Sequence, residues 1–276
     1  MKIISAVVNN PLFIEIQYKT LQRYFKGEFE LIIFNDGKAF IDTSNGGDIT
    51  MKKQISDTCK KLGLTCITVD NDNQQTCNMS ERHSHVFNNY ILPYQRLHPD
   101  PYLLLDSDMF LVDDFYPQQY LSKHSVVVPQ YKQIKDIGSI YYIWPGLCFM
   151  DFRIISHQEL LDWNCCPGLD TGGMMKNWLV SQEDSNFCIK DFSGHQRNKI
   201  YGIKHLSSCS WNATHLPKRL FSLLNFLEKD PRNKDGNFFC ELYDDVFLHY
   251  RAGSNWIGEG MTLHQELSRQ LYDILI

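Results

Sequence analysis

The chain has 276 residues, of which 43% are hydrophobic and 13% aromatic. This apolar content is enough for a large buried core, and it excludes a mostly disordered chain. The net charge of −5 argues against a nucleic-acid-binding protein, which normally presents a basic surface.

Strands and helices are predicted to alternate in the N-terminal part of the chain. Apolar, β-rich runs predict four strands, at residues 3–8, 29–34, 64–69 and 102–105, the first and the fourth of them buried. Amphipathic segments predict three helices between them, at residues 11–27, 48–62 and 80–92. This alternation favours an α/β fold with a mostly parallel central sheet and helices on both faces.

Particular residues are expected to set the ends of these helices. Asn10 is placed to cap the first helix, which begins with Pro11, a favoured first position. Gly63 is expected to end the second helix. Ser80 is expected to open the third helix, and Pro93 to end or kink it, because proline has no N–H for the helical ladder.

The C-terminal part of the chain is less regular. Strand-like runs occur at residues 125–130, 146–152 and 244–250, and a short helix is predicted at 181–189. Four leucines spaced four apart predict the packed face of a last helix: Leu263, Leu267, Leu271 and Leu275. Because the sequence shows no internal repeat and no linker, we expect a single domain over residues 1–276.

Polar residues follow the predicted strands at the ends where a parallel sheet binds its ligands. Asp106 and Asp108 come directly after the fourth strand, and Asn9 and Asp36 follow the first and second. Two carboxylates at i and i+2 offer hard oxygen ligands to Mg²⁺ or Mn²⁺. Aspartate is also a common turn former, so by itself the pair is equally compatible with a loop.

The segment "YLLLDSDMFLVDD" (102–114) resembles the Asp-x-Asp segment of GT-A glycosyltransferases. The resemblance implies a GT-A, Rossmann-like fold and a divalent cation, Mn²⁺ or Mg²⁺, that bridges the diphosphate of a nucleotide sugar. "SQEDSN" (181–186) and "LHYRAGSNW" (248–256) are similar to segments of glycosyltransferase family eight. Metal ligands are thereby implied at Asp106, Asp108 and His249.

The loop after His249 supplies groups that suit a diphosphate. Glycine lets backbone N–H groups approach phosphate oxygens, hydroxyl and amide side chains add donors, and a guanidinium neutralises charge. The predicted phosphate-binding residues are Arg251, Gly253, Ser254 and Asn255. The alternative is that His249 is an ordinary strand residue and that Trp256 belongs to the core.

Carboxylates in the C-terminal part are candidates for the catalytic base of an inverting enzyme, which takes the acceptor's proton. Asp184 is the first candidate, Glu183 the second and Asp170 the third, the last also as a ligand of sugar hydroxyls. Their ordinary alternatives are a helix N-cap for Asp170 and a solvated first helical turn for the other two.

The remaining predicted contacts belong to the nucleotide and the sugar. The nucleotide-binding candidates are Val8, Asn9, Asp36, Arg82 and Asp106. The candidates for the acceptor or the sugar are Trp144, Gly172, Gly173 and Trp256. A tryptophan ring offers a stacking surface to a sugar, although core packing is its commoner use.

The resemblance to GT-A glycosyltransferases implies a hexosyltransferase that moves a sugar from a UDP- or GDP-sugar to the hydroxyl of a carbohydrate or other acceptor. Residues 1–115 would form the nucleotide-binding half and residues 116–276 the acceptor-binding half. One alternative is a haloacid-dehalogenase-like phosphatase, with Asp244 and Asp245 as a second acidic pair. Another is a protein that binds nucleotide sugars without catalysis.

The cysteine content predicts the cellular compartment of the protein. The nine cysteines are odd in number and include no Cys-x-x-Cys pair, so we expect reduced thiols in a reducing compartment, the cytoplasm. The sequence has no run of about 18 apolar residues, which predicts that no segment spans a membrane.

Overall fold

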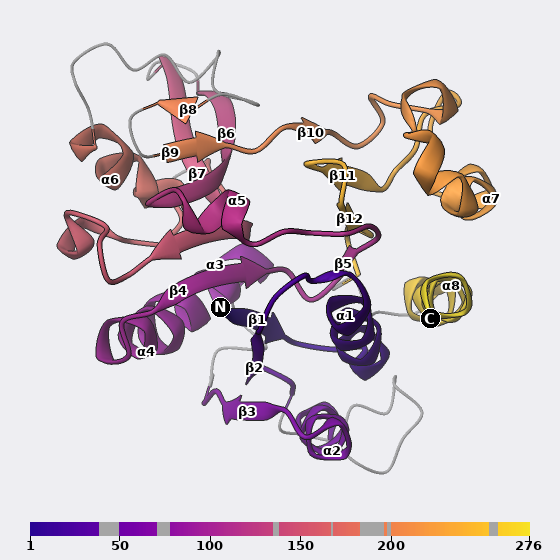
Figure 1. Ribbon diagram of the computed structural model, residues 1–276, viewed down its shortest axis with the longest axis horizontal. Helices are drawn as coiled ribbons and strands as arrows, with labels where there is room; N and C mark the ends of the chain where they lie inside the picture. The colour runs from indigo at the N-terminus through magenta and orange to yellow at the C-terminus, as the bar shows by residue number, and fades with distance from the viewer. Residues whose placement is uncertain are drawn as a thin grey trace.

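The computed structural model describes residues 1–38, 50–70, 78–134, 138–166, 168–182, 196–197, 200–253 and 259–276. Its centre is an eight-stranded sheet with the strand order β3-β2-β1-β4-β7-β6-β9-β8 (Figure 1). The strands are β1 (Lys2–Val7), β2 (Glu30–Asn35), β3 (Thr65–Thr68), β4 (Pro101–Leu105), β6 (Ser125–Ile134), β7 (Gly138–Asp151), β8 (Gln196–Arg197) and β9 (Ile200–Gly202).

Parallel pairing dominates this sheet, which confirms the predicted fold class. The strands β3, β2, β1 and β4 all pair in parallel, and β6 pairs in parallel with β9. The strand β7 runs antiparallel to both β4 and β6, and β8 runs antiparallel to β9. The sheet is therefore mixed, and β7, the neighbour of β4 in the sheet, runs in the reverse direction.

Helices cover both faces of the sheet (Figure 1). One face packs on α1 (Pro11–Tyr24) and α2 (Met51–Leu62). The other face packs on α3 (Met79–Val86), a π-helix (Phe87–Ile91), α4 (Leu92–Leu97) and α6 (Lys176–Ser181). Neighbouring residues Ile3 and Ile4 of β1 lie in different cores, which explains why the strand is apolar without alternation.

A third core joins a small antiparallel sheet to the C-terminal helix. This sheet has the order β10-β11-β12-β5, with β10 (His205–Leu206), β11 (Glu241–Tyr243), β12 (Phe247–His249) and β5 (Met109–Leu111). The helix α8 (Glu259–Leu275) lies beside α1 (Figure 1) and buries three of its four predicted leucines, the fourth being partly buried. The remaining described helices are α5 (Gln118–Leu121), α7 (Leu224–Lys229) and four 3₁₀ turns (Gln158–Leu160, Gly173–Met175, Ala213–His215 and Lys218–Leu223). None of the described helices has the length and apolarity to span a bilayer.

The helix that contains Pro93 differs from its prediction. It begins at Met79, where the side chain of Asn78, and not that of Ser80, accepts the N–H of Glu81. It also continues past Pro93 as far as Leu97. A π-helix, whose turns are wider than those of an α-helix, precedes α4. It places Pro93 in the first turn of α4, where the helical hydrogen bonds need no N–H from this residue.

The predicted cap at the start of α1 is also wrong. Asn10 precedes the helix, but its φ of 46° is left-handed and its side chain makes no capping hydrogen bond. The amide Nδ2 of Asn10 donates instead to Oγ of Ser268 in α8, over 2.8 Å. A tertiary contact has thus replaced the local one, and α1 ends at Tyr24, before the predicted end at residue 27.

The predicted strand at 244–250 proves to be part of a hairpin. Asp244 and Asp245 have φ angles of 44° and 58°, and the N–H of Val246 donates to the carbonyl of Tyr243 over 3.0 Å. Two consecutive left-handed residues are typical of a type I′ turn, which joins β11 to β12. The acidic pair of the phosphatase alternative therefore forms a turn, and the cluster of possible metal ligands found among the described residues does not include it.

Asp244→Asn is expected to stabilise the protein near neutral pH. Tyr120 donates to Oδ2 of Asp244 over 2.7 Å and the N–H of Lys204 to Oδ1 over 3.1 Å, contacts that an amide can keep. Burial raises the pKa of Asp244 to about 6 from 3.8, so ionising it costs the folded state free energy as pH rises through this window. We expect a gain of about 1–2 kcal/mol in the free energy of unfolding at about pH 7.5, and a smaller one at about pH 4.

Urea unfolding at both pH values measures this difference. The matched control is Asp245→Asn at the next turn position, which is also left-handed and whose carboxylate lies 3.6 Å from Nζ of Lys204. The control corrects for the preference of asparagine for left-handed backbone. An equal gain at both pH values for Asp244→Asn would contradict the prediction.

Candidate metal centre

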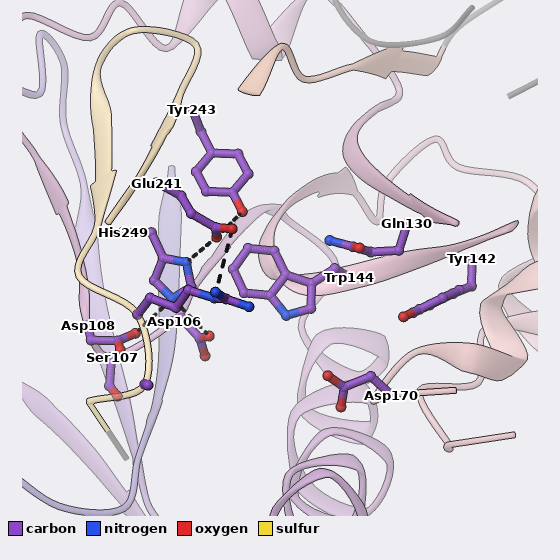
Figure 2. A pocket seen from close by; sticks show the side chains of 12 residues that line it. Asp106, Ser107, Asp108, Gln130, Tyr142, Trp144, Asp170, Glu241, Tyr243 and His249 are labelled. Carbon is purple, nitrogen blue, oxygen red and sulfur yellow. Dashed lines mark hydrogen bonds and ion pairs between the residues drawn. The ribbon is translucent and has the colours of Figure 1, made fainter. Parts of the chain in front are cut away.

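Asp106, Asp108 and His249 come together beyond the carboxyl end of β4 (Figure 2). One ligand atom from each lies within 4.8 Å of the other two. Nε2 of His249 is 3.2 Å from Oδ1 of Asp108 and 3.9 Å from Oδ2 of Asp106. Two carboxylates and an imidazole form a donor set that a divalent cation such as Mn²⁺ accepts, so these residues fit the predicted metal.

Strand pairing and a buried glutamine hold the Asp-x-Asp turn. The N–H of Asp106 donates to the carbonyl of Gly146 in β7 over 2.7 Å. From α1, Nε2 of Gln17 donates to the carbonyls of Asp106 and Met109 over 2.9 and 3.0 Å. Met109 is in turn the pairing partner of His249, so the β5–β12 ladder brings the histidine to the turn.

The loop after His249 closes on Asp108. The N–H of Gly253 donates to Oδ2 of Asp108 over 2.9 Å, and Arg251 and Ala252 before it have left-handed φ angles of 66° and 58°. A methyl group added at Gly253 would lie 2.9 Å from that oxygen and 2.6 Å from Cε2 of Phe13. The N–H of Gly253 thus fixes the orientation of the Asp108 carboxylate, and the phosphate-binding role of Gly253 stays a prediction.

Sequence reasoning missed Glu241, which contacts His249 from β11. Oε2 of Glu241 accepts hydrogen bonds from Nδ1 of His249 over 3.0 Å and from the hydroxyl of Tyr243 over 2.8 Å. Burial opposes its ionisation, but these bonds outweigh burial and lower the pKa of Glu241 to about 2. The signal in the sequence was the spacing of Glu241 and His249 around Asp244 and Asp245, provided these are taken as a two-residue hairpin turn.

Asp106 and Asp108 can both be ionised at low cost only when a positive charge lies between them. Burial, and then Asp108, raise the pKa of Asp106 to about 7. Burial also opposes charge on Asp108 and His249, but their mutual attraction outweighs it, so the pKa of Asp108 is lowered and that of His249 rises to about 10. A site that stabilises an imidazolium among carboxylates offers the same field to a cation, which binds as the proton leaves.

Two pockets meet at this cluster. The smaller, with a volume of about 310 Å³, is lined on its far side by Gln130, Tyr142, Trp144 and Asp170. The larger, of about 600 Å³, extends toward the carboxyl ends of β1 and β2 and is lined there by Val8, Asp36 and Arg82. Six residues line both pockets: Asp106, Ser107, Trp144, Asp170, Arg251 and Ala252.

A bulge in β7 places Trp144 between the two pockets. Pairing with β6 jumps from Cys148 opposite Val127 to Trp144 opposite Val128, which leaves three residues of β7 without a partner in β6. The indole stacks on Tyr243 with centroids 5.8 Å apart and lies 5.1 Å from the ring of His249. Figure 2 shows Asp170 and Tyr142 facing the same space from the opposite side.

The other predicted nucleotide-binding residues differ from one another in whether they line the larger pocket. Val8 and Asp36 line the larger pocket as expected. Arg82 lines it too, but its Nε lies 3.3 Å from Oδ2 of Asp36, and both side chains are largely buried, so the guanidinium is already paired. Asn9 is buried and is not among the residues that line either pocket.

Gly172 and Gly173 have packing reasons to be glycine. A methyl group on Gly172, whose φ is 88°, would lie 2.1 Å from the carbonyl oxygen of Ile143. One on Gly173 would lie 2.8 Å from the backbone nitrogen of Cys166. Neither glycine is among the residues that line the two pockets, and the close approach of a substrate that we predicted here stays a prediction.

Five further candidates lie outside the described residues: Glu183, Asp184, Ser254, Asn255 and Trp256. Their predicted roles stay predictions. The cysteines that the structure describes are free thiols, at positions 59, 66, 148, 165, 166, 209 and 240. The cytoplasmic location likewise stays a prediction.

Comparison with known proteins finds similarity to solved structures. No protein-family model and no curated protein matches the chain. Among solved structures, it is similar to an active-site mutant of LgtC, with 16% identity and a TM-score of 0.34, and to the galactosyltransferase LgtC in complex with donor and acceptor sugar analogs, with 14% identity and a TM-score of 0.33. Each match covers 55% of this chain and 58% of the other, so the chain spans little more than half of LgtC.

Proposed function

We propose that the protein is a GT-A-type hexosyltransferase. It moves a sugar from a UDP- or GDP-sugar to an acceptor hydroxyl, and it depends on Mn²⁺ or Mg²⁺. The observation that carries this proposal is the cluster of Asp106, Asp108 and His249 at the carboxyl rim of parallel strands, where two pockets meet. Ligands of doubly wound sheets bind at this rim.

The larger pocket suits the nucleotide. It runs from the ends of β1 and β2, at Val8 and Asp36, to Asp106 in the metal centre. In the proposal these two residues contact the base or the ribose. Arg251, which lines both pockets, faces the diphosphate and supplies positive charge opposite its oxygens.

The smaller pocket suits the sugar that is transferred. Trp144 offers the flat apolar face of its indole, while Gln130, Tyr142 and Asp170 offer polar groups around it. This combination binds pyranose rings, whose faces are apolar and whose edges carry hydroxyls. In the proposal Asp170 binds sugar hydroxyls, and Glu183, Asp184 or Asp170 takes the acceptor's proton.

The chemistry follows from these placements. When bound, the cation neutralises the charge that grows on the departing nucleotide diphosphate. Asp106, Asp108 and His249 hold that position, and Arg251 adds charge beside it. The proposed division into a nucleotide half (1–115) and an acceptor half (116–276) places the metal centre where β4 of the first half pairs with β7 of the second.

Calorimetric titration of the full chain with UDP and GDP, each with and without Mn²⁺, tests the proposal. We expect one of the two nucleotides to bind tightly only when Mn²⁺ is present. Binding of equal strength without the cation, or release of inorganic phosphate from phosphomonoesters with no nucleotide binding, would overturn it. Cation-dependent binding without hydrolysis or transfer of any nucleotide sugar would favour the non-catalytic alternative.

A further inference from the structure

His249 has a second partner besides Asp108, and this partner, Glu241, is held in place by protein groups alone. The two nitrogens of an imidazole lie on opposite sides of the ring, and in His249 Nε2 faces Asp108 while Nδ1 faces Glu241 over 3.0 Å. Glu241 therefore lies behind the ring. It is not a member of the ligand cluster found among the described residues.

We infer that Glu241 is a positioning residue of the metal centre: it accepts the Nδ1 proton of His249 and so directs the Nε2 lone pair toward the cation. A histidine ligand works only in the tautomer that leaves its metal-facing nitrogen unprotonated. A carboxylate behind the ring selects that tautomer, fixes the ring's orientation and makes the metal-facing nitrogen more basic. The inference rests on the proposed function only in requiring a cation at Asp106, Asp108 and His249.

The backbone aims Glu241 at His249. The two residues are direct partners in the antiparallel β11–β12 ladder, so their side chains project from the same face of the sheet. The tight turn between the two strands fixes this register, because a slip of one residue would point Glu241 to the other face. The contact is thus set by the hairpin and does not depend on a flexible side chain finding its partner.

Other groups hold the carboxylate in place. Oε1 of Glu241 accepts the N–H of Ser208 over 3.1 Å, and Oε2 accepts the hydroxyl of Tyr243 over 2.8 Å. The ring of Tyr243 stacks between His205, 5.3 Å away, and Trp144, 5.8 Å away. With only 12% of its side chain exposed and both oxygens bonded, Glu241 presents one lone pair to Nδ1 from a fixed position.

Titration of the full-length protein with Mn²⁺ alone, followed by electron paramagnetic resonance, tests the inference. The variants are Glu241→Ala, Glu241→Gln and Tyr243→Phe, with His249→Ala as the reference for loss of the ligand itself. The exposed Glu228→Gln in α7 is the matched control for removing a carboxylate. Thermal unfolding of every variant shows whether it is folded.

We expect Glu241→Ala to weaken Mn²⁺ binding about 10–100-fold, the range typical of such outer partners. Glu241→Gln, whose amide oxygen still accepts the Nδ1 proton, should lose less, and Tyr243→Phe less again. Nitrogen NMR of the Zn²⁺-loaded protein should show His249 as the Nδ1–H tautomer in wild type, and a changed signal in Glu241→Ala.

Two outcomes separate the inference from the proposed function. If the wild-type protein binds no Mn²⁺, the metal centre itself is refuted. If wild type binds Mn²⁺ and folded Glu241→Ala binds it within about twofold as tightly, the positioning role is refuted while the metal centre stands. A lower unfolding temperature with unchanged Mn²⁺ affinity has the same meaning, since it assigns Glu241 to stability alone.

Discussion

Asp108→Asn is expected to abolish cation-dependent nucleotide binding and to leave the fold intact. The carboxylate is buried, with one oxygen toward His249 and the other held by the N–H of Gly253. The amide keeps the shape of the side chain but removes the charge that attracts the cation. We expect Mn²⁺ affinity to fall more than about 100-fold, beyond the range for residues that act behind a ligand.

Mn²⁺ titration and calorimetry with nucleotide measure both losses in one protein. The matched control is Asp114→Asn, a few residues along the chain, whose exposed carboxylate pairs with Lys26 over 2.7 Å. The control should bind Mn²⁺ like wild type. Normal cation-dependent binding in folded Asp108→Asn would falsify the metal assignment and, with it, the observation that carries the proposed function.

Gly146→Ala is expected to remove the sugar site while leaving the metal centre in place. A methyl group at this position would lie 2.0 Å from Cζ2 of Trp144 and 2.3 Å from its Cη2, so the indole has to leave its place between the pockets. The backbone nitrogen and carbonyl stay free to pair, and the carbonyl still accepts the N–H of Asp106. We expect nucleotide-sugar affinity to fall about tenfold or more, because stacking and its solvent exclusion are lost.

Trp144→Ala gives the matched comparison, since it removes the same ring without adding a methyl group. Both variants should keep Mn²⁺ affinity and lose nucleotide-sugar affinity by similar factors. The double variant should lose no more than either one, because the two changes act through one side chain. Additive losses would mean that Gly146 acts through something other than the Trp144 ring, and unchanged affinity in both would remove the indole from the sugar site.

Much of the candidate site follows from local sequence. Continuous apolar runs predicted β1, β2 and β4, because strands buried on both faces have no polar side, and a β-rich run also predicted the edge strand β3, which is only partly buried. Parallel strands with their carboxyl ends on one rim then placed Asp36 and Asp106 along one pocket, and Asp108 lies beside Asp106. Gly63 ends α2 in the left-handed conformation that made it a predictable stop.

Predictions failed where a residue's role depends on how secondary-structure elements pack or pair. Asn10 has the chemistry of a cap, but Ser268 of α8 takes its amide. Pro93 is a helix breaker by rule, yet a π-helix that is packed in the core carries the helix past it. Glu241 was missed because its role appears only when β11 and β12 are paired and the register is known.

The sequence by itself determined the α/β class, the rim and the two carboxylates, because apolar patterning and strand ends are local properties of the chain. Tertiary structure alone decided the direction of β7, whose bulge aims Trp144 between the pockets, and the hairpin that sets Glu241 behind His249. The direction of β7 is set by its pairing with β4, which is remote in sequence. The β7 bulge and the β11–β12 register depend on which residues pair across neighbouring strands, which apolar patterning does not specify, and the hairpin could be inferred only by taking Asp244 and Asp245 as a two-residue turn. The two aspartates were therefore predicted from the sequence, whereas the groups that orient His249 were not.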